Sequence, residues 1–479
     1  MTAEEIKDRN NEVVTFGCRL NSYESEAIKE ALKKSDQKNL IVFNSCAVTS
    51  QAERQLRQAV RQARKKNPQA KIVVTGCAAQ IDPQKYAKMV EVDLVLGNVE
   101  KSNPENYSKI GKTSSTTQEI FRFAQYDITS NRHPERSEGS HDDIAHKDRI
   151  FLETKKSTAL FLTENETAKI VVNDIMSVKD TAPQLVSYFE NRTRAFLEIQ
   201  NGCNHRCTFC IIPFGRGNSR SVAFGEIVTQ VKKMVAAGHK EVVLTGVDIS
   251  GYGEDLLLPI SLSQMIKRLL KLVPELPRLR LSSIDVAEID DGIIDLIANE
   301  PRFMPYLHLS VQSGDNIILK RMKRRHNCEQ VLEFCANMRK LRPEITFGSD
   351  IIAGFPTETD EMFLNSVNLI KEAGIIFNHI FPYSKREGTP AAKMPPVNGK
   401  VIKERAKILR ETSEAELQKF LQKQIGKKLS VIMENGDFSK SENFLDVKIL
   451  NRPDDVKSGD ILEVNISAVE ENFLLGTLK

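Results

Sequence analysis

Six of the eight cysteines stand in two groups of three, and the spacing within each group suggests metal chemistry. The compact group is Cys203, Cys207 and Cys210 in GCNHRCTFC, a C-x3-C-x2-C motif that directly follows an apolar run. Three thiolates at this spacing can bind three irons of an iron–sulfur cube and leave its fourth iron without a protein ligand. The amino and carboxylate groups of S-adenosylmethionine can chelate such an iron. A reduced cluster then cleaves the sulfonium of this cofactor and produces a 5′-deoxyadenosyl radical.

Two other interpretations of the compact group are a structural zinc site and three packing cysteines. Zinc would need a fourth ligand, and His205 stands too close in the sequence for good tetrahedral geometry. Cys328 and Cys335 lie on the same face of the expected helix and are expected to pack in a core. The compact group is therefore predicted to bind an iron–sulfur cluster.

The second group is Cys18, Cys46 and Cys77, and each of them closes an apolar run that reads as a strand. Parallel strands of an open sheet share one edge at their carboxyl ends, so these thiols should converge there. Thiolates suit a soft metal–sulfide centre, and a second cluster is predicted. The three runs are EVVTFGC (12–18), NLIVFNSC (39–46) and AKIVVTGC (70–77).

The elements that must position these thiols follow from the periodicity of the chain. Apolar runs alternate with helical patterns at 22–34 and 49–66, and a fourth run covers 92–98. This pattern is typical of βαβ units, so residues 1–101 are predicted to form an open parallel-sheet domain of the flavodoxin type. Residues 102–169 are polar with little periodicity, and we expect a disordered insertion or linker there.

Residues 170–415 are predicted to form an incomplete TIM-type barrel of six strand–helix units, with activity at the carboxyl ends of its strands. The expected strands are 194–200, 241–246, 278–283, 306–311, 345–352 and 375–384. The expected helices are 224–237, 261–272, 289–299, 328–340 and 359–373. A charged helix at about 400–425 follows, and residues 416–479 should hold a small antiparallel β-barrel. The fold class is therefore α/β with three domains.

Composition excludes some classes of protein. A net charge of +4 over 479 residues is too small to predict nucleic-acid binding by itself. Apolar runs stay shorter than the ~18 residues of a membrane span, and the start of the sequence lacks the apolar core of a signal peptide. We expect a cytoplasmic protein without disulfides, because the cytosol keeps thiols reduced.

Several segments resemble the methylthiotransferases within the radical S-adenosylmethionine superfamily. They are IQNGCNHRCTFCIIPFGRGNSRS, TGVDISGYGED, RLSSID, HLSVQSGDNIILKRMKR, DIIAGFPTET and FPYSKREGTPAA. The resemblance spans nearly the whole chain except 102–169. It implies two [4Fe–4S] clusters, one on Cys203, Cys207 and Cys210 and an auxiliary one with an open iron on Cys18, Cys46 and Cys77. It also implies a methylthio group built from auxiliary-cluster sulfur and an S-adenosylmethionine methyl.

The resemblance suggests where the cofactor is held. Thr245 and Gly246 take the place of a Gly-Gly-Glu stretch that binds the cofactor's amino group in many members. Val247 and Asp248 follow instead, so the match there is partial. Further cofactor neighbours are expected at strand ends and on a nearby basic segment, namely Ser283, Gln312 and Arg324.

Substrate contacts are expected on two basic features and on the terminal barrel, which resembles the TRAM module. Arg54, Arg57, Arg61 and Arg64 recur at steps of three, four and three, which puts them on one helix face that could bind phosphates or simply face solvent. KRMKRR (320–325) adds charge near the barrel mouth. The implied partners are the anticodon stem-loop of transfer RNA and an electron donor such as flavodoxin or ferredoxin. We expect a monomer.

The motifs look most like the subfamily that adds a methylthio group to C2 of N6-threonylcarbamoyladenosine at position 37 of transfer RNA. Relatives that act on N6-isopentenyladenosine 37 differ after the first cysteine. Those that modify a ribosomal-protein aspartate carry proline-lysine in place of Arg19-Leu20. A non-catalytic iron–sulfur protein that binds RNA or senses redox state is a further alternative. The QSG (312–314) and GFP (354–356) stretches at strand ends argue against it, because a sensor does not need them.

Overall fold

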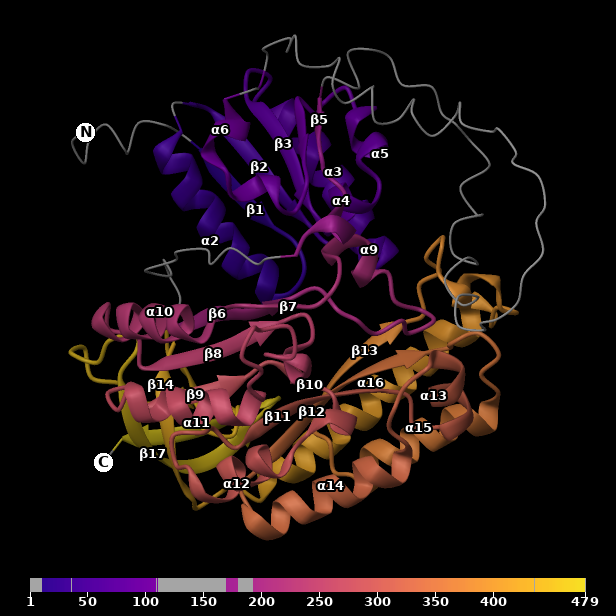
Figure 1. The fold of residues 1–479 in the computed structure, drawn as a ribbon. Helices are drawn as coiled ribbons and strands as arrows, with labels where there is room; N and C mark the ends of the chain where they lie inside the picture. Colours follow the sequence, from indigo (N-terminus) through magenta and orange to yellow (C-terminus); the bar gives the residue numbers. More distant parts are fainter. Residues whose placement is uncertain are drawn as a thin grey trace, which may run out of the picture.

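The computed structural model describes residues 11–110 except 36 and 109, residues 169–179, and residues 193–478 except 435. Figure 1 shows an open sheet with its helices lying over a half-barrel, whose far end carries a small closed barrel. Most of the segment 102–169 that was expected to be disordered lies outside the described residues. Its first residues do form an ordered helix, α6 (Pro104–Tyr107).

The first sheet is parallel throughout, as predicted, and its strands stand in sequence order. Flavodoxin-type sheets have the order 2-1-3-4-5, so the topology here differs from that of flavodoxin. The last strand follows residue 169 and hydrogen-bonds to the fourth, although 170 was the predicted start of the next domain. The strands are β1 (Glu12–Thr15), β2 (Leu40–Ser45), β3 (Lys71–Gly76), β4 (Leu94–Leu96) and β5 (Ile170–Val171).

Helices cover both faces of this sheet because alternate strand residues point to opposite sides. Ile28 and Leu32 of α2 (Arg19–Lys34) pack on one face. Leu56 and Val60 of α3 (Ser50–Lys66) pack on the other. The short helices α4 (Cys77–Ile81) and α5 (Pro83–Ala87) complete the second face.

Helix α2 begins three residues earlier than expected, since the Asn-Ser pair at 21–22 resembles an N-cap. Asn21 instead donates hydrogen bonds to the carbonyls of Phe16 (2.7 Å) and Ser45 (3.0 Å) from inside the helix. Tyr23 and Ala27 of the same helix join the core of the half-barrel. Helix α2 is therefore shared by the sheet and the half-barrel.

The half-barrel contains all six predicted strands, and they run parallel. The third strand breaks at Ser282, and this break divides the half-barrel into two four-stranded sheets. A short strand, β7 (Arg220–Ser221), adds antiparallel to the first. The strands are β6 (Arg194–Asn201), β8 (Glu241–Gly246), β9 (Arg278–Leu281), β10 (Ser283–Ile284), β11 (Tyr306–Gln312), β12 (Thr346–Ala353) and β13 (Phe377–Pro382).

The five predicted helices are present, and two short ones, α9 and α13, were not expected from the sequence. Asp315 caps α13 by accepting hydrogen bonds from the amides of Ile317 and Ile318, but the helix is too short to give a periodic pattern. The helices are α9 (Ile212–Arg216), α10 (Phe224–Ala236), α11 (Leu262–Leu272), α12 (Asp291–Asn299), α13 (Asn316–Met322), α14 (Cys328–Leu341) and α15 (Asp360–Glu372). Cys335 is buried and Cys328 partly buried in the half-barrel core, as expected.

The terminal barrel is closed, in the order β14-β15-β16-β18-β17, and one pair, β16 with β18, is parallel. The predicted barrel was purely antiparallel and missed β15, because three of its four residues, FSKS, are polar. Its strands are β14 (Lys428–Met433), β15 (Phe438–Ser441), β16 (Asp446–Ile449), β17 (Ile461–Glu470) and β18 (Phe473–Leu478).

Helix α16 (Gly399–Gln422) connects the half-barrel to the closed barrel and runs through the predicted domain limit at 415/416. Ala406 and Leu409 pack on the half-barrel, whereas Leu421 packs in the core of the closed barrel. The domain limits stay predictions, and this helix belongs to both parts.

Candidate active site

The compact cysteine group lies in the loop between β6 and α9, at the carboxyl end of the first half-barrel strand. The loop is tightly folded, since the amide of Cys210 donates to the carbonyl of Cys207 (3.1 Å) and the amide of Cys203 to that of Gly217 (3.1 Å). All three cysteines are partly buried and unpaired by disulfides. Burial raises the pKa of Cys210 to about 12, so metal binding must displace protons from this loop. The donor set fits a cluster with one open iron.

His205 is unsuited to be a fourth zinc ligand. Its ring nitrogen Nε2 lies 2.9 Å from an oxygen of Asp248 and 3.5 Å from one of Glu288. Hydrogen bonds to these two carboxylates raise the pKa of His205 to about 10, and metal binding requires a neutral imidazole. The zinc alternative therefore finds no support at this residue.

Arg324, one of the predicted cofactor neighbours, lies at the compact group. Its Nη1 is 3.6 Å from the sulfur of Cys207, and its Nη2 donates to Asp285 (3.0 Å) and to the carbonyl of Ser310 (2.7 Å). The side chain is nearly buried, and its Nε has no hydrogen-bond partner among the described residues. A guanidinium held this firmly can stabilise thiolate charge beside the loop.

The other predicted cofactor residues lie at carboxyl ends of half-barrel strands, which is the end that carries the cysteine loop. Thr245 and Gly246 close β8, Ser283 opens β10, and Gln312 closes β11 with a positive φ of 72°. These residues have no contact with the cysteines comparable to that of Arg324 in the described structure. Their role as cofactor ligands stays a prediction.

Two buried polar residues of β6 were not singled out from the sequence. Gln200 accepts hydrogen bonds at Oε1 from the amides of Val247 (3.0 Å) and Asp248 (2.8 Å), so it shapes the turn after β8. Glu198 is 4 % exposed, and burial raises its pKa to about 7. The available signal was a pair of polar residues inside the otherwise apolar run FLEIQ.

The second cysteine group converges as predicted at the carboxyl edge of the first sheet. Cys46 directly follows β2, Cys77 directly follows β3, and Cys18 is the N-cap of α2. Gly17 has a φ of 104°, and a Cβ there would come within 3.0 Å of the Cys46 sulfur, which brings the Cys18 segment against Cys46. Burial, followed by the nearby Cys77, raises the pKa of Cys46 to about 12. Three convergent thiols suit a second cluster with an open iron.

Arg216 joins the two cysteine groups. It ends α9, the helix that follows the Cys203–Cys210 loop, and its Nε donates to the sulfur of Cys77 at 3.0 Å. A Cβ on Gly215 would lie 3.2 Å from the Cβ of Cys77, so α9 is in direct contact with the second group. Figure 1 shows α9 at the junction between the first sheet and the half-barrel. The short helix α9 therefore links the two predicted metal sites, because the Cys203–Cys210 loop precedes it and Cys77 contacts its last two residues.

A buried charge network holds Arg216 in place. Its guanidinium forms a two-pronged ion pair with Glu24 and donates to Asn21 at 2.6 Å. Lys101 binds the same carboxylate at 2.7 Å, through the oxygen that also accepts from Nη2 of Arg216. Glu24, Arg216 and Lys101 are 1 %, 2 % and 0 % exposed, so neither cation can lose its partner cheaply. No sequence pattern predicted this network.

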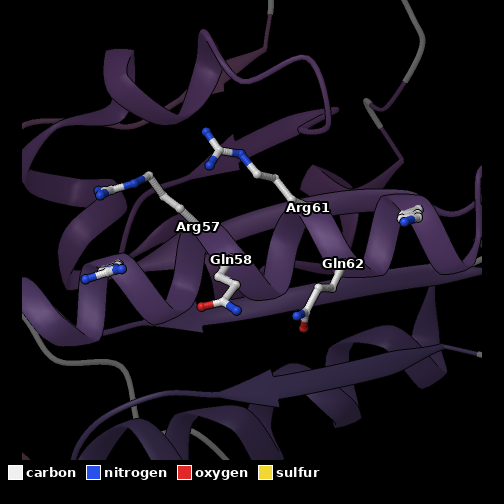
Figure 2. A pocket seen from close by; sticks show the side chains of 6 residues that line it. Arg57, Gln58, Arg61 and Gln62 are labelled. Atoms are coloured by element: carbon white, nitrogen blue, oxygen red, sulfur yellow. The ribbon is translucent and has the colours of Figure 1, made fainter.

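The predicted basic face of α3 is present, with one correction. Figure 2 shows Arg57 and Arg61 projecting from α3 with Gln58 and Gln62 between and beside them. A shallow pocket lies on this face, and the residues that line it are Arg54, Arg57, Gln58, Arg61, Gln62 and Lys65. Arg64 instead turns to the sheet edge, where its guanidinium donates to the carbonyls of Pro68, Ala70 and Glu91 and to Asp93. Arg64 is therefore a structural residue, and the exposed face consists of the other three arginines and Lys65.

No helix in the described part of the chain combines the length and the apolar character needed to cross a bilayer. Parallel strands, a cysteine loop at their carboxyl end and a second convergent cysteine group are the features that a radical S-adenosylmethionine enzyme with an auxiliary cluster requires.

Comparison with known proteins makes the assignment specific. The Radical SAM superfamily model matches residues 197–370, and the Uncharacterized protein family UPF0004 model matches residues 10–97. Threonylcarbamoyladenosine tRNA methylthiotransferase MtaB of Rickettsia prowazekii is 49 % identical over 98 % of this chain and 99 % of its own length. The protein of the same name from Aquifex aeolicus is 35 % identical over 91 % of this chain and 95 % of its own length.

More distant proteins extend the comparison. The tRNA-2-methylthio-N(6)-dimethylallyladenosine synthase of Cereibacter sphaeroides is 28 % identical over 97 % of both chains. The solved structure of TsrM, a radical S-adenosylmethionine methyltransferase from Kitasatospora setae, superposes with a TM-score of 0.51. That structure covers 80 % of this chain and 74 % of its own at 14 % identity, so the likeness concerns the fold alone.

The chain belongs to the methylthiotransferase family of radical S-adenosylmethionine enzymes. It is a transferase, and its cofactors are S-adenosylmethionine and two [4Fe–4S] clusters. The alternative of a non-catalytic iron–sulfur sensor is thereby set aside.

Proposed function

We propose that this enzyme attaches a methylthio group to C2 of N6-threonylcarbamoyladenosine at position 37 of transfer RNA. The observation that carries the proposal is the 49 % identity to the Rickettsia prowazekii protein named for that nucleoside, against 28 % for relatives named for dimethylallyladenosine. The alternatives are the isopentenyl (dimethylallyl) nucleoside at the same position and a ribosomal-protein aspartate.

We assign the radical cluster to Cys203, Cys207 and Cys210, and the auxiliary cluster to the cysteines at the edge of the first sheet, Cys18, Cys46 and Cys77. When bound, the cofactors supply a radical that activates an unreactive C–H carbon and a sulfur that carries the methyl group. The residues of the chain hold and screen them. Arg324 lies 3.6 Å from the Cys207 sulfur, and Arg216 donates to Cys77 at 3.0 Å. Thr245, Gly246, Ser283 and Gln312 are proposed to contact S-adenosylmethionine.

The short span of α9 between the two cysteine groups supports sulfur delivery from the auxiliary cluster. A substrate carbon activated at one cysteine group would be close to the sulfur held at the other, and proximity of this kind lowers the barrier to bond formation. We propose that the anticodon stem-loop lies across this junction. Arg54, Arg57 and Arg61 would bind its phosphates, and the TRAM-like barrel would support it. A flavodoxin or ferredoxin donor, a monomeric state and a cytoplasmic location stay predictions.

The test uses a bacterial strain that lacks 2-methylthio-threonylcarbamoyladenosine and expresses this chain. Mass spectrometry of transfer-RNA nucleosides should then detect that nucleoside and leave isopentenyladenosine unchanged. Appearance of the methylthio group on isopentenyladenosine instead would transfer the proposal to the second nucleoside. Absence of both products, with the chain expressed and its clusters loaded, would overturn it.

Two variants separate the roles of the cysteine groups. Cys207→Ala should abolish formation of 5′-deoxyadenosine from S-adenosylmethionine in the purified, anaerobically reconstituted enzyme. Cys46→Ala should keep that cleavage and lose the methylthio product. Cys335→Ala is the matched control, since Cys335 is fully buried among apolar side chains away from both groups.

A further inference from the structure

A cluster of cations surrounds one aromatic ring at the floor of the half-barrel. Phe444, in the turn between β15 and β16, stacks on Tyr306 of β11 with 4.4 Å between ring centroids. The closed barrel thereby covers the lower end of the half-barrel, where Tyr306 begins β11. Positive charges lie near the Phe444 ring at 4.4 to 5.8 Å from its centroid. They belong to Arg19, Arg194, Arg280 and Lys440.

Three of these four cations have a carboxylate partner. Arg280 pairs with Glu241 at 2.9 Å, where both side chains are fully buried. Arg194 pairs with Glu434 at 2.8 Å. Lys440 pairs with Asp446. Each of these charges is therefore compensated within the chain itself.

Arg19 is the exception in this cluster. It makes no hydrogen bond or ion pair with any residue that the structure describes, although it is half-buried. Its guanidinium lies beside those of Arg194 and Arg280 around the Phe444 ring. A cation removed from water among other cations is costly unless an anion compensates it. The position is therefore electrostatically prepared for an anion.

Asp350 is a candidate for an internal partner, but it forms its hydrogen bonds with two histidines of the neighbouring strands instead. Its Oδ1 lies 3.0 Å from Nε2 of His308 and 3.2 Å from Nδ1 of His379. The pKa of Asp350, which burial would raise, is held well below its usual range by these two histidines. The carboxylate is thus engaged along the strands, and the Arg19 guanidinium is left for a ligand.

The position of Arg19 in the sequence tells which ligand this is. Arg19 directly follows Cys18, an assigned ligand of the auxiliary cluster, and opens α2, which lies between the first sheet and β6 (Figure 1). In adenine, C2 and C6 flank N1, so a group on N6 projects beside the carbon that receives the methylthio group. The threonylcarbamoyl group ends in a free carboxylate, whereas the dimethylallyl group is uncharged.

We propose that Arg19 binds the carboxylate of the threonylcarbamoyl group and thereby determines the choice of substrate, an inference that rests on the proposed function. A guanidinium can pair with a carboxylate through two parallel hydrogen bonds, which fixes the orientation of the N6 substituent. An uncharged N6 group would leave Arg19 uncompensated, so the site rejects the dimethylallyl nucleoside. Arg19 is a substrate-binding residue that takes no part in radical chemistry.

The test measures kcat/KM of the reconstituted full-length enzyme on two anticodon stem-loops. One carries N6-threonylcarbamoyladenosine, and the other carries its primary amide, which has the same shape without the charge. The wild type should prefer the acid by about 30-fold or more, because losing one partner of a desolvated charge pair costs at least about 2 kcal/mol. Arg19→Gln should reduce this preference to within about threefold, mainly by lowering activity on the acid. Arg19→Lys should recover part of it.

Two further measurements distinguish a loss of substrate recognition from damage to the enzyme and its clusters. Uncoupled cleavage of S-adenosylmethionine and the iron content should be the same in Arg19→Gln and wild type. The matched control is Arg61→Gln on the exposed face of α3, which should weaken binding of the acid and the amide equally. If Arg19→Gln loses its clusters, the wild-type preference for the acid and its value in Arg19→Lys decide the question.

The outcomes distinguish the two proposals. A wild-type enzyme that modifies the acid and the amide equally well, or an Arg19→Gln variant that keeps the full preference, overturns the role of Arg19 and leaves the proposed function intact. A wild-type enzyme that is inactive on both RNAs but modifies a stem-loop with isopentenyladenosine overturns the proposed function.

Discussion

Glu24 is the carboxylate on which the buried charge network depends, and its replacement gives a prediction with a definite sign. Glu24→Gln keeps the shape of the side chain and leaves Arg216 and Lys101 without a counter-charge at 2 % and 0 % exposure. Removal of one partner from a buried ion pair costs about 3–5 kcal/mol. We expect a loss of that size in the local stability of α2 at neutral pH.

A second substitution should restore stability. Lys101→Met in the Glu24→Gln background removes one uncompensated ammonium and should regain about 1–3 kcal/mol. Part of the gain is offset because Asn98 loses the hydrogen bond that Lys101 donates at 2.7 Å, at a cost of about 1 kcal/mol. In the wild-type background the same Lys101→Met change should destabilise. The effect of Lys101→Met on stability thus changes sign with the charge at position 24.

The network also predicts the direction of a pH effect. Burial alone would raise the pKa of Glu24, but Arg216 and Lys101 lower it to about 2, below the unfolded value of 4.5. The stability that this carboxylate contributes is complete above pH 4.5 and is lost as the pH falls toward 2. Glu24→Gln should abolish this part of the acid sensitivity.

The assay is amide hydrogen exchange followed by mass spectrometry on peptides from α2, because exchange reports local opening free energies in a protein of several domains. Glu30→Gln on the same helix is the control. Glu30 forms an exposed pair with Lys33 at 2.8 Å, and its loss should change stability by less than about 0.5 kcal/mol. The reasoning is wrong if the double variant exchanges as fast as Glu24→Gln, or faster.

Three shorter predictions concern other parts of the molecule. Arg64→Ala should lower the melting temperature without changing RNA affinity. Arg61→Ala should leave the melting temperature unchanged and weaken RNA binding, and it should reduce by about one the number of counterions released on binding, as measured by fluorescence anisotropy at several salt concentrations. Burial raises the pKa of Glu198 from 4.5 to about 7, so its contribution to stability falls as the pH rises across that window. Glu198→Gln should therefore melt well above wild type at pH 8 and close to it at pH 5, and an equal difference at both pH values contradicts the assignment. Arg280→Met should cost about 3–5 kcal/mol because Glu241 stays charged and buried, and urea unfolding of Glu241→Gln/Arg280→Met should then show strong non-additivity.

The sequence was sufficient to predict what depends on local pattern. Continuous apolar runs located the half-barrel strands, and the cysteines at 46 and 77 follow their strands directly because a run that ends in a polar turn marks a strand end. Spacing alone grouped Cys203, Cys207 and Cys210. Helical periodicity placed the arginines of α3 on one side but could not tell Arg61 from Arg64. That difference depends on the carbonyls that the sheet edge offers to one of them.

Long-range pairing could not be predicted. Glu24 and Lys101 occur in segments whose charges read as solvent-exposed, and their burial depends on Arg216 arriving from another part of the chain. Phe444 occupies a turn with a φ of 71°, where a polar residue or glycine is usual. Both features arise from contacts between domains, which leave no periodic signal in the sequence.

The stacking of Phe444 on Tyr306 has a consequence for how the protein matures. On the ribosome the strands of the half-barrel emerge first, and the turn that closes their lower end follows only after α16 and β15. Until then Tyr306 lacks its stacking partner, and Arg280 lacks the carbonyls of Ser441 and Glu442 to which it donates. Both cysteine groups are therefore synthesised before the turn that covers Tyr306 and Arg280, so the contacts at this end of the half-barrel are the last of the three to become possible.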